Sequence, residues 1–355
     1  MSKIIAIGTA DASFRLKQEN VKDFIYNLFS QTELDMERLI NVFDNSTVST
    51  RHFTVPIEWI SKDHSFSERN DLFIKHALTL SEETTTECLI KAGADKSDIN
   101  HIIFVSSTGL ATPTIDALLF NRFKMDTHIK RTPIWGLGCA GGAVGLSRAM
   151  EYTRAFPLEN VLLICVELCS LTFQKDDLSK SNVVATSLFS DGAAAVLIAG
   201  EKSKLAEKNN GILLMDSLST TYHDSLDVMG WDVVDNGFKV IFRRDIPTIV
   251  REYVYPNIKE LLDKNHLSIS DIKHYVTHPG GLKVIKAYEE SIGLTNGSLD
   301  YARKILNEHG NMSSPSVLYV LNEFMSNAKY NPNERGLISA LGPGFSSELL
   351  LFETA

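Results

Sequence analysis

The sequence predicts an α/β layered fold built from two duplicated halves, and two observations support this prediction. The first is an alternation of short apolar runs with segments of helical period. Apolar runs typical of buried strands lie at residues 102–105, 161–166, 193–198 and 336–341, and helical patterns lie at residues 73–92 and 143–154. This alternation indicates strands packed against helices. The second observation is an internal repeat.

The repeat joins two seven-residue segments. Residues 97–103 (SDINHII) are similar to residues 270–276 (SDIKHYV). Each segment predicts a capped turn that leads into a buried strand. Chance similarity between two common turn-to-strand patterns is the alternative, and seven positions alone would not exclude it.

The spacing that follows each copy favours duplication. Cys139 lies 38 residues after His101, and Asn311 lies 37 residues after His274. Both follow a glycine and precede small residues and then a helical pattern. We therefore expect Cys139 and Asn311 at equivalent turns of two halves. The polar stretch at residues 200–210 is a natural boundary, which predicts halves at residues 1–205 and 206–355.

The composition is that of an ordinary folded chain of 355 residues, 44% hydrophobic and 22% charged. The net charge of −9 argues against a general nucleic-acid binder, although a local basic mouth can still receive an anionic small ligand. The N-terminus lacks the features of a signal peptide, and no run approaches the ~18 apolar residues of a membrane span. The four cysteines contain no Cys-x-x-Cys pair, which argues against a structural zinc site. We expect a cytoplasmic protein with reduced thiols.

Cys139 is the first candidate for catalysis. It lies in a small-residue elbow at residues 136–143 (GLGCAGGA), between an apolar run and a helical pattern. Glycines permit a sharp turn, and a helix beginning just after Cys139 would favour the nucleophilic thiolate. The alternative is a small buried cysteine in a tight core turn. The elbow alone does not decide between them.

Two further side chains become candidates through the repeat. His278 follows a predicted strand, although a single histidine there is more often structural. Asn311 follows Gly310 and precedes a helix, so its default interpretation is an N-cap. Because the repeat places Asn311 where Cys139 lies in the other half, Cys139, His278 and Asn311 can converge on one pocket. The GPGF segment at 342–345 predicts a hairpin turn whose N–H groups can also face that pocket.

These segments together resemble the type III polyketide synthases, the chalcone-synthase superfamily. The resemblance covers essentially the whole chain. The motifs that carry it are GCAGG at 138–142, LFSDGAA at 188–194, HPGG at 278–281, GNMSS at 310–314 and GPGF at 342–345. The resemblance implies a thiolase-like five-layer αβαβα fold, no cofactor, acyl-CoA and malonyl-CoA as substrates, and a homodimer.

The resemblance also implies roles for individual residues. Cys139 would carry the acyl chain as a thioester, and His278 and Asn311 would bind the malonyl thioester carbonyl and stabilise the enolate formed on decarboxylation. His278 would also help to keep Cys139 ionised. Phe189 resembles an apolar gatekeeper between the CoA tunnel and the cavity. The remaining substrate-binding residues implied are Cys169, Thr172, Val240, Thr112, Ser313, Gly342, Pro343, Gly344 and Phe345, with Arg38 as a CoA-binding residue.

Several positions depart from the plant members of this family. Val240 replaces a gating phenylalanine, which predicts a wider mouth. Thr112 replaces a methionine that crosses the dimer interface, and Asn45 replaces a lysine that grips CoA. Segments at 67–70 and 229–233 resemble bacterial members that make alkylpyrones or alkylresorcinols, so a long-chain fatty acyl-CoA starter is the expectation. The alternatives are a ketoacyl synthase that performs one condensation and a phloroglucinol-type synthase that uses malonyl-CoA alone.

Overall fold

The chain, seen here in a computed structural model, is described at residues 1–30, 32, 35–242, 246–294 and 297–355. Its strands are β1 (Ser2–Asp11), β2 (Phe14–Lys17), β3 (Thr50–Phe53), β4 (His101–Ser106), β5 (Lys130–Trp135), β6 (Asn160–Leu168), β7 (Asp191–Ala199), β8 (Ile212–Thr221), β9 (Met229–Val234), β10 (Gly237–Phe242), β11 (Ile272–Thr277), β12 (Arg335–Gly342) and β13 (Ser346–Thr354). Its helices are α1 (Gln18–Phe29), α2 (Met36–Asp44), α3 (Phe66–Ala92), α4 (Ile115–Phe123), α5 (Gly141–Ala155), α6 (Lys180–Leu188), α7 (Lys204–Lys208), α8 (Ile246–Lys264), α9 (Leu282–Ile292), α10 (Asp300–His309) and α11 (Ser314–Asn327). The apolar runs and helical patterns singled out in the sequence all fall within these elements, which confirms the predicted α/β class.

The sheet topology repeats itself. Nine strands are hydrogen-bonded in the order β11-β12-β13-β8-β1-β7-β6-β4-β5. In one half, β4 runs parallel to β6, and the antiparallel pairs β6–β7 and β7–β1 follow. In the other half, β11 runs parallel to β12, and the antiparallel pairs β12–β13 and β13–β8 follow. Each half therefore contains the same four-strand pattern.

The two copies of the repeated segment fold alike. A short 3-10 turn precedes β4, and another precedes β11. Each turn is closed by a reciprocal capping box, formed by Asp95 with Asp98 in the first copy and by Ser268 with Asp271 in the second. An acidic side chain at the third turn position satisfies the backbone N–H of the capping residue, which explains why the two sequences share Ser-Asp-Ile.

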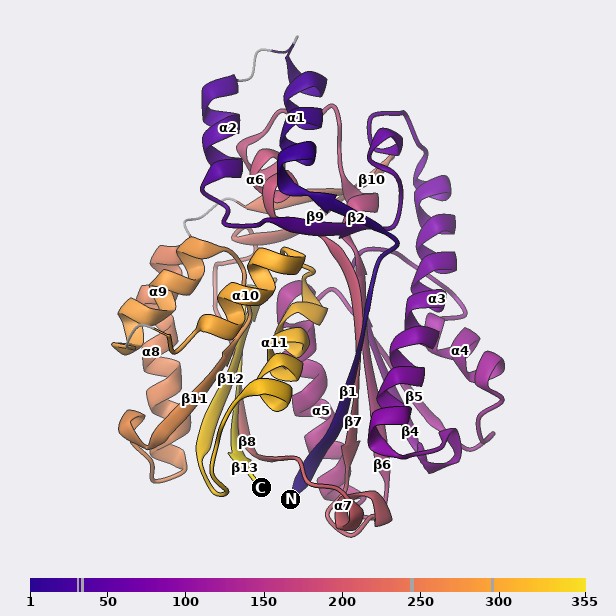
Figure 1. The fold of residues 1–355 in the computed structure, drawn as a ribbon, viewed down its shortest axis with the longest axis vertical. Helices are drawn as coiled ribbons and strands as arrows, with labels where there is room; N and C mark the ends of the chain where they lie inside the picture. The colour runs from indigo at the N-terminus through magenta and orange to yellow at the C-terminus, as the bar shows by residue number, and fades with distance from the viewer. Residues whose placement is uncertain (31, 33–34, 243–245, 295–296) are drawn as a thin grey trace.

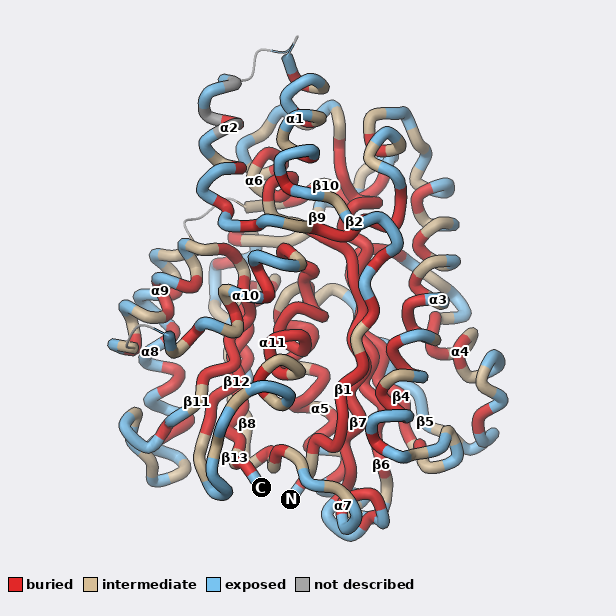
Figure 2. The backbone as a smooth tube through the Cα atoms, viewed as in Figure 1, coloured by how far each residue is buried: buried red, intermediate tan, exposed pale blue. Residues whose placement is uncertain are grey.

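Helices α5 and α11 form the central layer between the two parts of the sheet (Figure 1). Most residues of both α5 and α11 are buried, as the red tube in Figure 2 shows. The helices approach closely because glycine lies at their contact. A Cβ built on Gly142 would stand 2.3 Å from the Ser314 carbonyl oxygen. Helix α3 covers one outer face and α8 with α9 covers the other, which completes five layers (Figure 1).

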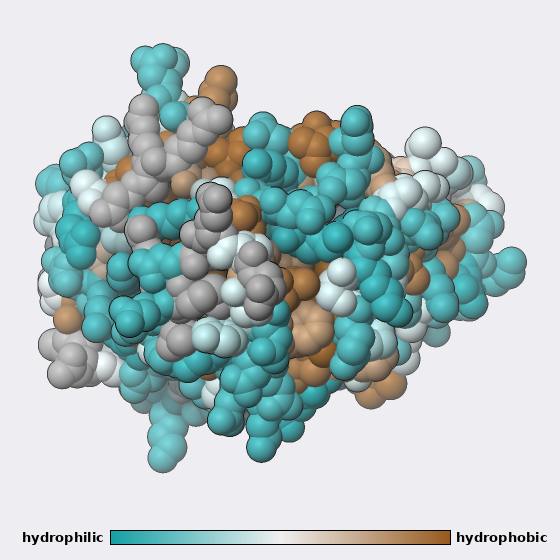
Figure 3. All heavy atoms as spheres, turned by 90° about the horizontal axis from the view of Figure 1, so that it is seen from above, coloured by the Kyte–Doolittle hydropathy of each residue, from teal (hydrophilic) through white to brown (hydrophobic). Residues whose placement is uncertain are grey.

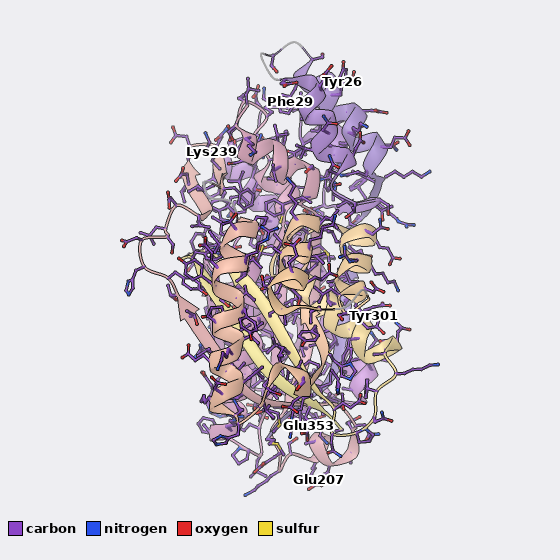
Figure 4. All side chains as sticks on the ribbon, turned by 90° about the vertical axis from the view of Figure 1, so that its left-hand side faces the viewer. Tyr26, Phe29, Glu207, Lys239, Tyr301 and Glu353 are labelled. Carbon is purple, nitrogen blue, oxygen red and sulfur yellow. The ribbon has the colours of Figure 1, made fainter. Side chains whose placement is uncertain are left out.

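A cap lies over the end of the molecule where β4, β6, β11 and β12 finish. It consists of α1, α2, α6 and the two-stranded sheets β2–β3 and β9–β10 (Figure 1). Figure 4 labels Tyr26 and Phe29 of α1 and Lys239 of β10 at this end, with Glu207 and Glu353 at the opposite end. Seen from above, most of the surface of this cap is hydrophilic, with apolar atoms showing between polar ones (Figure 3). None of the helices in the described ranges is long and apolar enough to cross a membrane.

Candidate active site

The turn that carries Cys139 joins β5 to α5. Gly136 and Gly138 adopt φ angles of +90° and +46°, which glycine accepts far more readily than residues with a Cβ. A single 3-10 turn, Gly138–Ala140, places Cys139 two residues before Gly141, the first residue of α5. The predicted elbow and the helix that follows it are therefore confirmed. The thiol is free and partly exposed, unlike the other three cysteines, which are buried.

Asn311 lies on the equivalent turn of the other half, between α10 and α11. Its backbone N–H donates to the Leu188 carbonyl at 2.8 Å, and its carbonyl accepts from the Ser190 N–H at 2.9 Å. Its Oδ1 accepts from the Ser313 N–H at 2.8 Å. The N-cap of α11 is Ser313, at a φ of +58°, so the default interpretation of Asn311 as the N-cap is wrong. Asn311 is held by a neighbouring loop and is free to serve the site.

His278 is the first residue after β11, as expected. Its backbone N–H donates to the Ser339 carbonyl at 2.8 Å, which ties it to the end of β12. The side chain is buried, and neither ring nitrogen has a hydrogen-bond partner among the described residues. Buried polar groups without partners are uncommon, and in the wall of a cavity they mark a place where a ligand can bind.

One cavity of about 920 Å³ unites these three side chains. Cys139, His278 and Asn311 all line it, as do Leu188 and Phe189. Cys139 follows β5, His278 follows β11, and Asn311 lies in the turn before α11. The two halves of the fold bring these three segments together. Cys139, His278 and Asn311 thus line one pocket, as the sequence predicted. A volume of this size is ample for a small-molecule substrate.

The electrostatics of the site differ from the expected ion pair. Burial raises the pKa of the Cys139 thiol to about 11, with the Glu167 carboxylate adding to the rise and hydrogen bonds from Ser313 and Asn311 opposing it. Burial lowers the pKa of His278 to about 3. Because each group loses more hydration than its surroundings replace, burial opposes the ionisation of both the Cys139 thiol and the His278 imidazole. The expectation that His278 helps to keep Cys139 ionised stays a prediction.

Glu167 was not predicted as part of the site. It is fully buried at the end of β6, and its Oε1 accepts hydrogen bonds from the hydroxyls of Ser107 and Ser314, each at 2.9 Å. Its Oε2 accepts from the Thr108 hydroxyl at 2.8 Å and the Ser107 N–H at 3.0 Å. Burial nevertheless raises the pKa of Glu167 to about 7. The only sequence signal was a carboxylate directly after a long apolar run.

A second, much smaller cavity of about 30 Å³ shares a wall with the first. Phe189 lines both cavities, so its ring stands between them. Cys169, Thr172 and Val240 line the small cavity, on the far side of Phe189. Val240 therefore lines the smaller cavity and not the larger one, and the expectation that it widens the mouth stays a prediction. Phe242, which contacts Phe189 with ring centroids 6.0 Å apart, lines the large cavity.

Some predicted substrate-binding residues line neither cavity. Thr112 is exposed in the loop before α4. The hairpin at 342–345 joins β12 to β13 as predicted, but it lies behind the Cys139 turn. A Cβ on Gly138 would stand 2.9 Å from the Pro343 ring, and one on Gly342 would stand 2.5 Å from the Leu137 carbonyl. Gly342 and Pro343 thus pack against the Cys139 turn, and none of the four hairpin residues lines either cavity. Arg38 lies in α2, and its side chain is outside the described residues.

Three lysines give the large cavity a basic mouth. Lys180 begins α6, and Lys283 and Lys286 lie on α9; all three line the cavity and are exposed. None of them forms an ion pair with a described carboxylate. Asn45, which stands where the resemblance predicts a lysine, lines the same cavity. Sequence reasoning did not single out these lysines, because no spacing within α6 or α9 shows that the two helices meet at one opening.

Comparison with known proteins decides the family. Residues 1–202 match the family model of chalcone and stilbene synthases, N-terminal domain, and residues 216–355 match its C-terminal domain. The chain belongs to the chalcone and stilbene synthase family. These are type III polyketide synthases, acyl-transferring enzymes that condense CoA thioesters with loss of CO₂ and need no cofactor beyond those substrates.

Individual relatives of this family are similar along their whole length. A putative chalcone synthase of Bacillus subtilis (strain 168) is 47% identical, covering 99% of this chain and 98% of the relative. The 1,3,6,8-tetrahydroxynaphthalene synthase of Streptomyces peucetius subsp. caesius is 34% identical, covering 99% and 92%. The crystal structure of 1,3,6,8-tetrahydroxynaphthalene synthase from Streptomyces coelicolor A3(2), a bacterial type III polyketide synthase, superposes with a TM-score of 0.94 at 26% identity, covering 99% of each chain. The thiolase-like fold of the type III polyketide synthases is therefore confirmed.

Proposed function

We propose that this type III polyketide synthase loads a long-chain fatty acyl-CoA on Cys139, extends it with malonyl-CoA and cyclises the product to an alkylpyrone or alkylresorcinol. The observation that carries the catalytic assignment is that Cys139, His278 and Asn311 line one cavity, where the imidazole nitrogens have no hydrogen-bond partner among the described residues.

Loading begins from the neutral pair. The Cys139 sulfur attacks the thioester carbonyl of the starter while its proton passes to a ring nitrogen of His278. The tetrahedral intermediate expels CoA, whose sulfur takes that proton back from the imidazole. A neutral histidine is the form required at this step, and the low pKa of His278 supplies it.

Extension again involves His278, now together with Asn311. The side chains of His278 and Asn311 hydrogen-bond to the carbonyl oxygen of the malonyl thioester. As the carboxylate leaves as CO₂, its bonding electrons form an enolate, which these donors stabilise. The enolate carbon then attacks the Cys139 thioester, a carbon–carbon bond forms, and the Cys139 thiolate is released. The apolar ring of Phe189, beside the reacting groups, favours neutral CO₂ over the carboxylate.

The lysines of the mouth are our candidates for gripping the CoA phosphates. Lys180, Lys283 and Lys286 bring three positive charges to one opening of an otherwise acidic protein. We expect the double variant Lys283→Gln/Lys286→Gln to raise the KM for CoA thioesters about tenfold while KM for N-acetylcysteamine thioesters stays unchanged. Lys208→Gln, at α7 on the opposite end of the molecule, is the control (Figure 1). An equal KM increase for both substrate types would contradict this assignment.

The two cavity volumes and the relatives bear on which starter the enzyme uses. The large cavity of about 920 Å³ has room for a folded chain, whereas the cavity on the other side of Phe189 has a volume of only about 30 Å³. This small inner cavity, together with the tetrahydroxynaphthalene synthase names of several relatives, favours a second candidate, a synthase that uses malonyl-CoA alone.

A starter panel distinguishes the two candidates. The purified enzyme is incubated with malonyl-CoA and fatty acyl-CoAs of graded length, and products are identified by mass spectrometry. Long-chain pyrones or resorcinols support the proposal, and products from malonyl-CoA alone support the second candidate. A requirement for an acyl carrier protein would instead indicate a ketoacyl synthase. Cys139→Ala should form no product with any starter while its circular dichroism stays unchanged.

We also infer that the enzyme is a cytoplasmic homodimer. Strand β5 is an edge of the nine-stranded sheet, its residues are almost all exposed, and Trp135 at its end is 49% exposed. An exposed edge strand is a natural pairing surface for a second copy. The four free thiols are consistent with a reducing compartment. Light scattering after gel filtration tests the dimer, and a monomer at micromolar concentration would contradict it.

A further inference from the structure

A cluster of three side chains lies outside the catalytic cavity, where β1, β3 and α10 meet. Asp11 is the last residue of β1, His52 lies in β3, and His309 is the last residue of α10. Each offers one atom suited to bind a metal ion, and these three atoms lie within 4.8 Å of one another. In the described part of the chain, no other group of three or more His, Cys, Asp or Glu side chains meets this condition.

The distances in this cluster are close to those of a metal site. His309 Nδ1 lies 2.9 Å from Asp11 Oδ1, and His52 Nε2 lies 3.7 Å from Asp11 Oδ2. Two donor atoms of a tetrahedral zinc ion, with bonds of about 2.0–2.1 Å, stand about 3.4 Å apart. The two printed distances, each to a different oxygen of Asp11, therefore lie within about half an ångström of zinc-like spacing, and all three donors lie within 4.8 Å of one another.

The surrounding structure holds the donors in place. The backbone of His52 is fixed on both sides by one hydroxyl, since its N–H donates to Ser190 Oγ at 2.9 Å and its carbonyl accepts from that oxygen at 3.0 Å. The Tyr319 hydroxyl donates to Asp11 Oδ1 at 3.1 Å, which leaves Oδ2 for another partner. Hydrogen bonds to a ligating carboxylate are the usual outer support of a metal site.

The cluster is also accessible. The side chain of Asp11 is 38% exposed and that of His309 is 19% exposed, whereas that of His52 is 8% exposed. An ion can therefore enter from solvent, and water can occupy the remaining coordination position. One carboxylate and two imidazoles form a donor set preferred by zinc, cobalt and nickel over magnesium or calcium.

We propose that Asp11, His52 and His309 bind one divalent transition-metal ion through three protein ligands and a water molecule. The ion links β1, β3 and α10, which are far apart in the sequence. The ion would also lie close to the candidate catalytic residues, because His309 lies two residues before Asn311. In addition, Ser190, whose hydroxyl fixes His52, donates its backbone N–H to the Asn311 carbonyl at 2.9 Å.

Co²⁺ is the probe for the first experiment. Full-length, tag-free protein is treated with a chelator and alkylated with iodoacetamide, so that the Cys139 thiol does not compete for metal. It is then titrated with Co²⁺ by calorimetry and by visible absorption. We expect one ion per chain, with the visible bands of nitrogen and oxygen coordination and no thiolate charge-transfer band. Unsaturable binding up to millimolar Co²⁺, or a thiolate band, would overturn the proposal.

Variants locate the site. Asp11→Asn and His309→Gln, at partly exposed positions, should each weaken Co²⁺ binding about tenfold or more. His274→Gln is the matched control, because His274 Nε2 pairs with Glu334 at 2.8 Å but has no second imidazole beside it. The control should bind as tightly as the parent protein. Unchanged affinity in both site variants would refute the assignment, as would Mg²⁺ competing with Co²⁺ at equal concentration.

Discussion

Replacing Glu167 by glutamine should stabilise the protein in mildly alkaline solution. The carboxylate is fully buried at the end of β6, and burial raises its pKa from 4.5 to about 7. Glutamine has nearly the same shape and carries no charge. Its carbonyl can accept the bonds now made to Oε2, and the Ser107 and Ser314 hydroxyls can rotate to accept from its amide.

The sign and size of the effect follow from proton linkage. Between pH 4.5 and about 7 the folded protein keeps a proton on Glu167 that the unfolded chain has lost, so stability falls as the pH rises through this window. The difference of about 2.5 pKa units corresponds to roughly 3.5 kcal/mol, at about 1.4 kcal/mol per unit. Glu167→Gln should escape this loss, so its advantage over the parent should approach roughly 3.5 kcal/mol at pH 8 and vanish near pH 4.5.

Urea denaturation followed by fluorescence at pH 5, 6, 7 and 8 measures this difference directly. Glu334→Gln is the control of opposite sign. The His274 and Asn331 contacts lower the pKa of Glu334 to about 2, so its charged form contributes stability above pH 4.5, and the substitution should give no gain. If Glu167→Gln were no more stable than the parent at pH 8, or if its advantage did not depend on pH, the burial argument would be wrong.

Three further predictions concern the site. Iodoacetamide inactivation of the free enzyme should accelerate about tenfold per pH unit from pH 7 to 10, because the pKa of Cys139 is about 11, and a plateau reached below pH 7 would show a resting ion pair instead. Gly142→Ala should cost about 1–3 kcal/mol in urea denaturation, since its Cβ would meet the Ser314 carbonyl at 2.3 Å; Gly93→Ala, with no atom within 4 Å but a φ of +58°, separates crowding from backbone strain. Phe189→Ala should join the two cavities and shift product formation toward bulkier starters in the mass-spectrometric panel, whereas the exposed Phe156→Ala should not.

The sequence predicted the framework of the site well because the framework is local and repeated. The elbow around Cys139 and the turn before Asn311 are each specified by glycines and by the helix that follows. The repeated Ser-Asp-Ile segment indicated that both turns belong to equivalent units. Conversely, the sequence did not show that Val240 lines the smaller cavity. The packing of the β9–β10 hairpin over Phe189 determines which cavity a side chain of β10 lines. The local sequence does not predict that packing.

Charges were harder to predict than positions. The expectation of an ionised Cys139 rested on the start of α5 and on a neighbouring imidazole, both of which favour a thiolate. It did not include two effects that raise the pKa of Cys139, which are the loss of hydration around the sulfur and the charge of the Glu167 carboxylate. The sequence shows neither the burial of Cys139 nor its proximity to Glu167. Likewise, Lys180 and Lys283 lie about a hundred residues apart, and only the folded chain brings them to one opening.

The duplicated architecture explains why one cavity can hold two different chemistries. Equivalent turns in the two halves present Cys139 and Asn311 to the same cavity, where we propose that one is a nucleophile and the other a hydrogen-bond donor. Their convergence depends on the close approach of α5 and α11, which Gly142 permits. Neither ring nitrogen of His278, at the end of β11, has a hydrogen-bond partner among the described residues, so in the proposed function the imidazole is available to the reacting groups in both loading and extension. A neutral imidazole suits this double duty, since it accepts the thiol proton in the first step and donates to the enolate in the second.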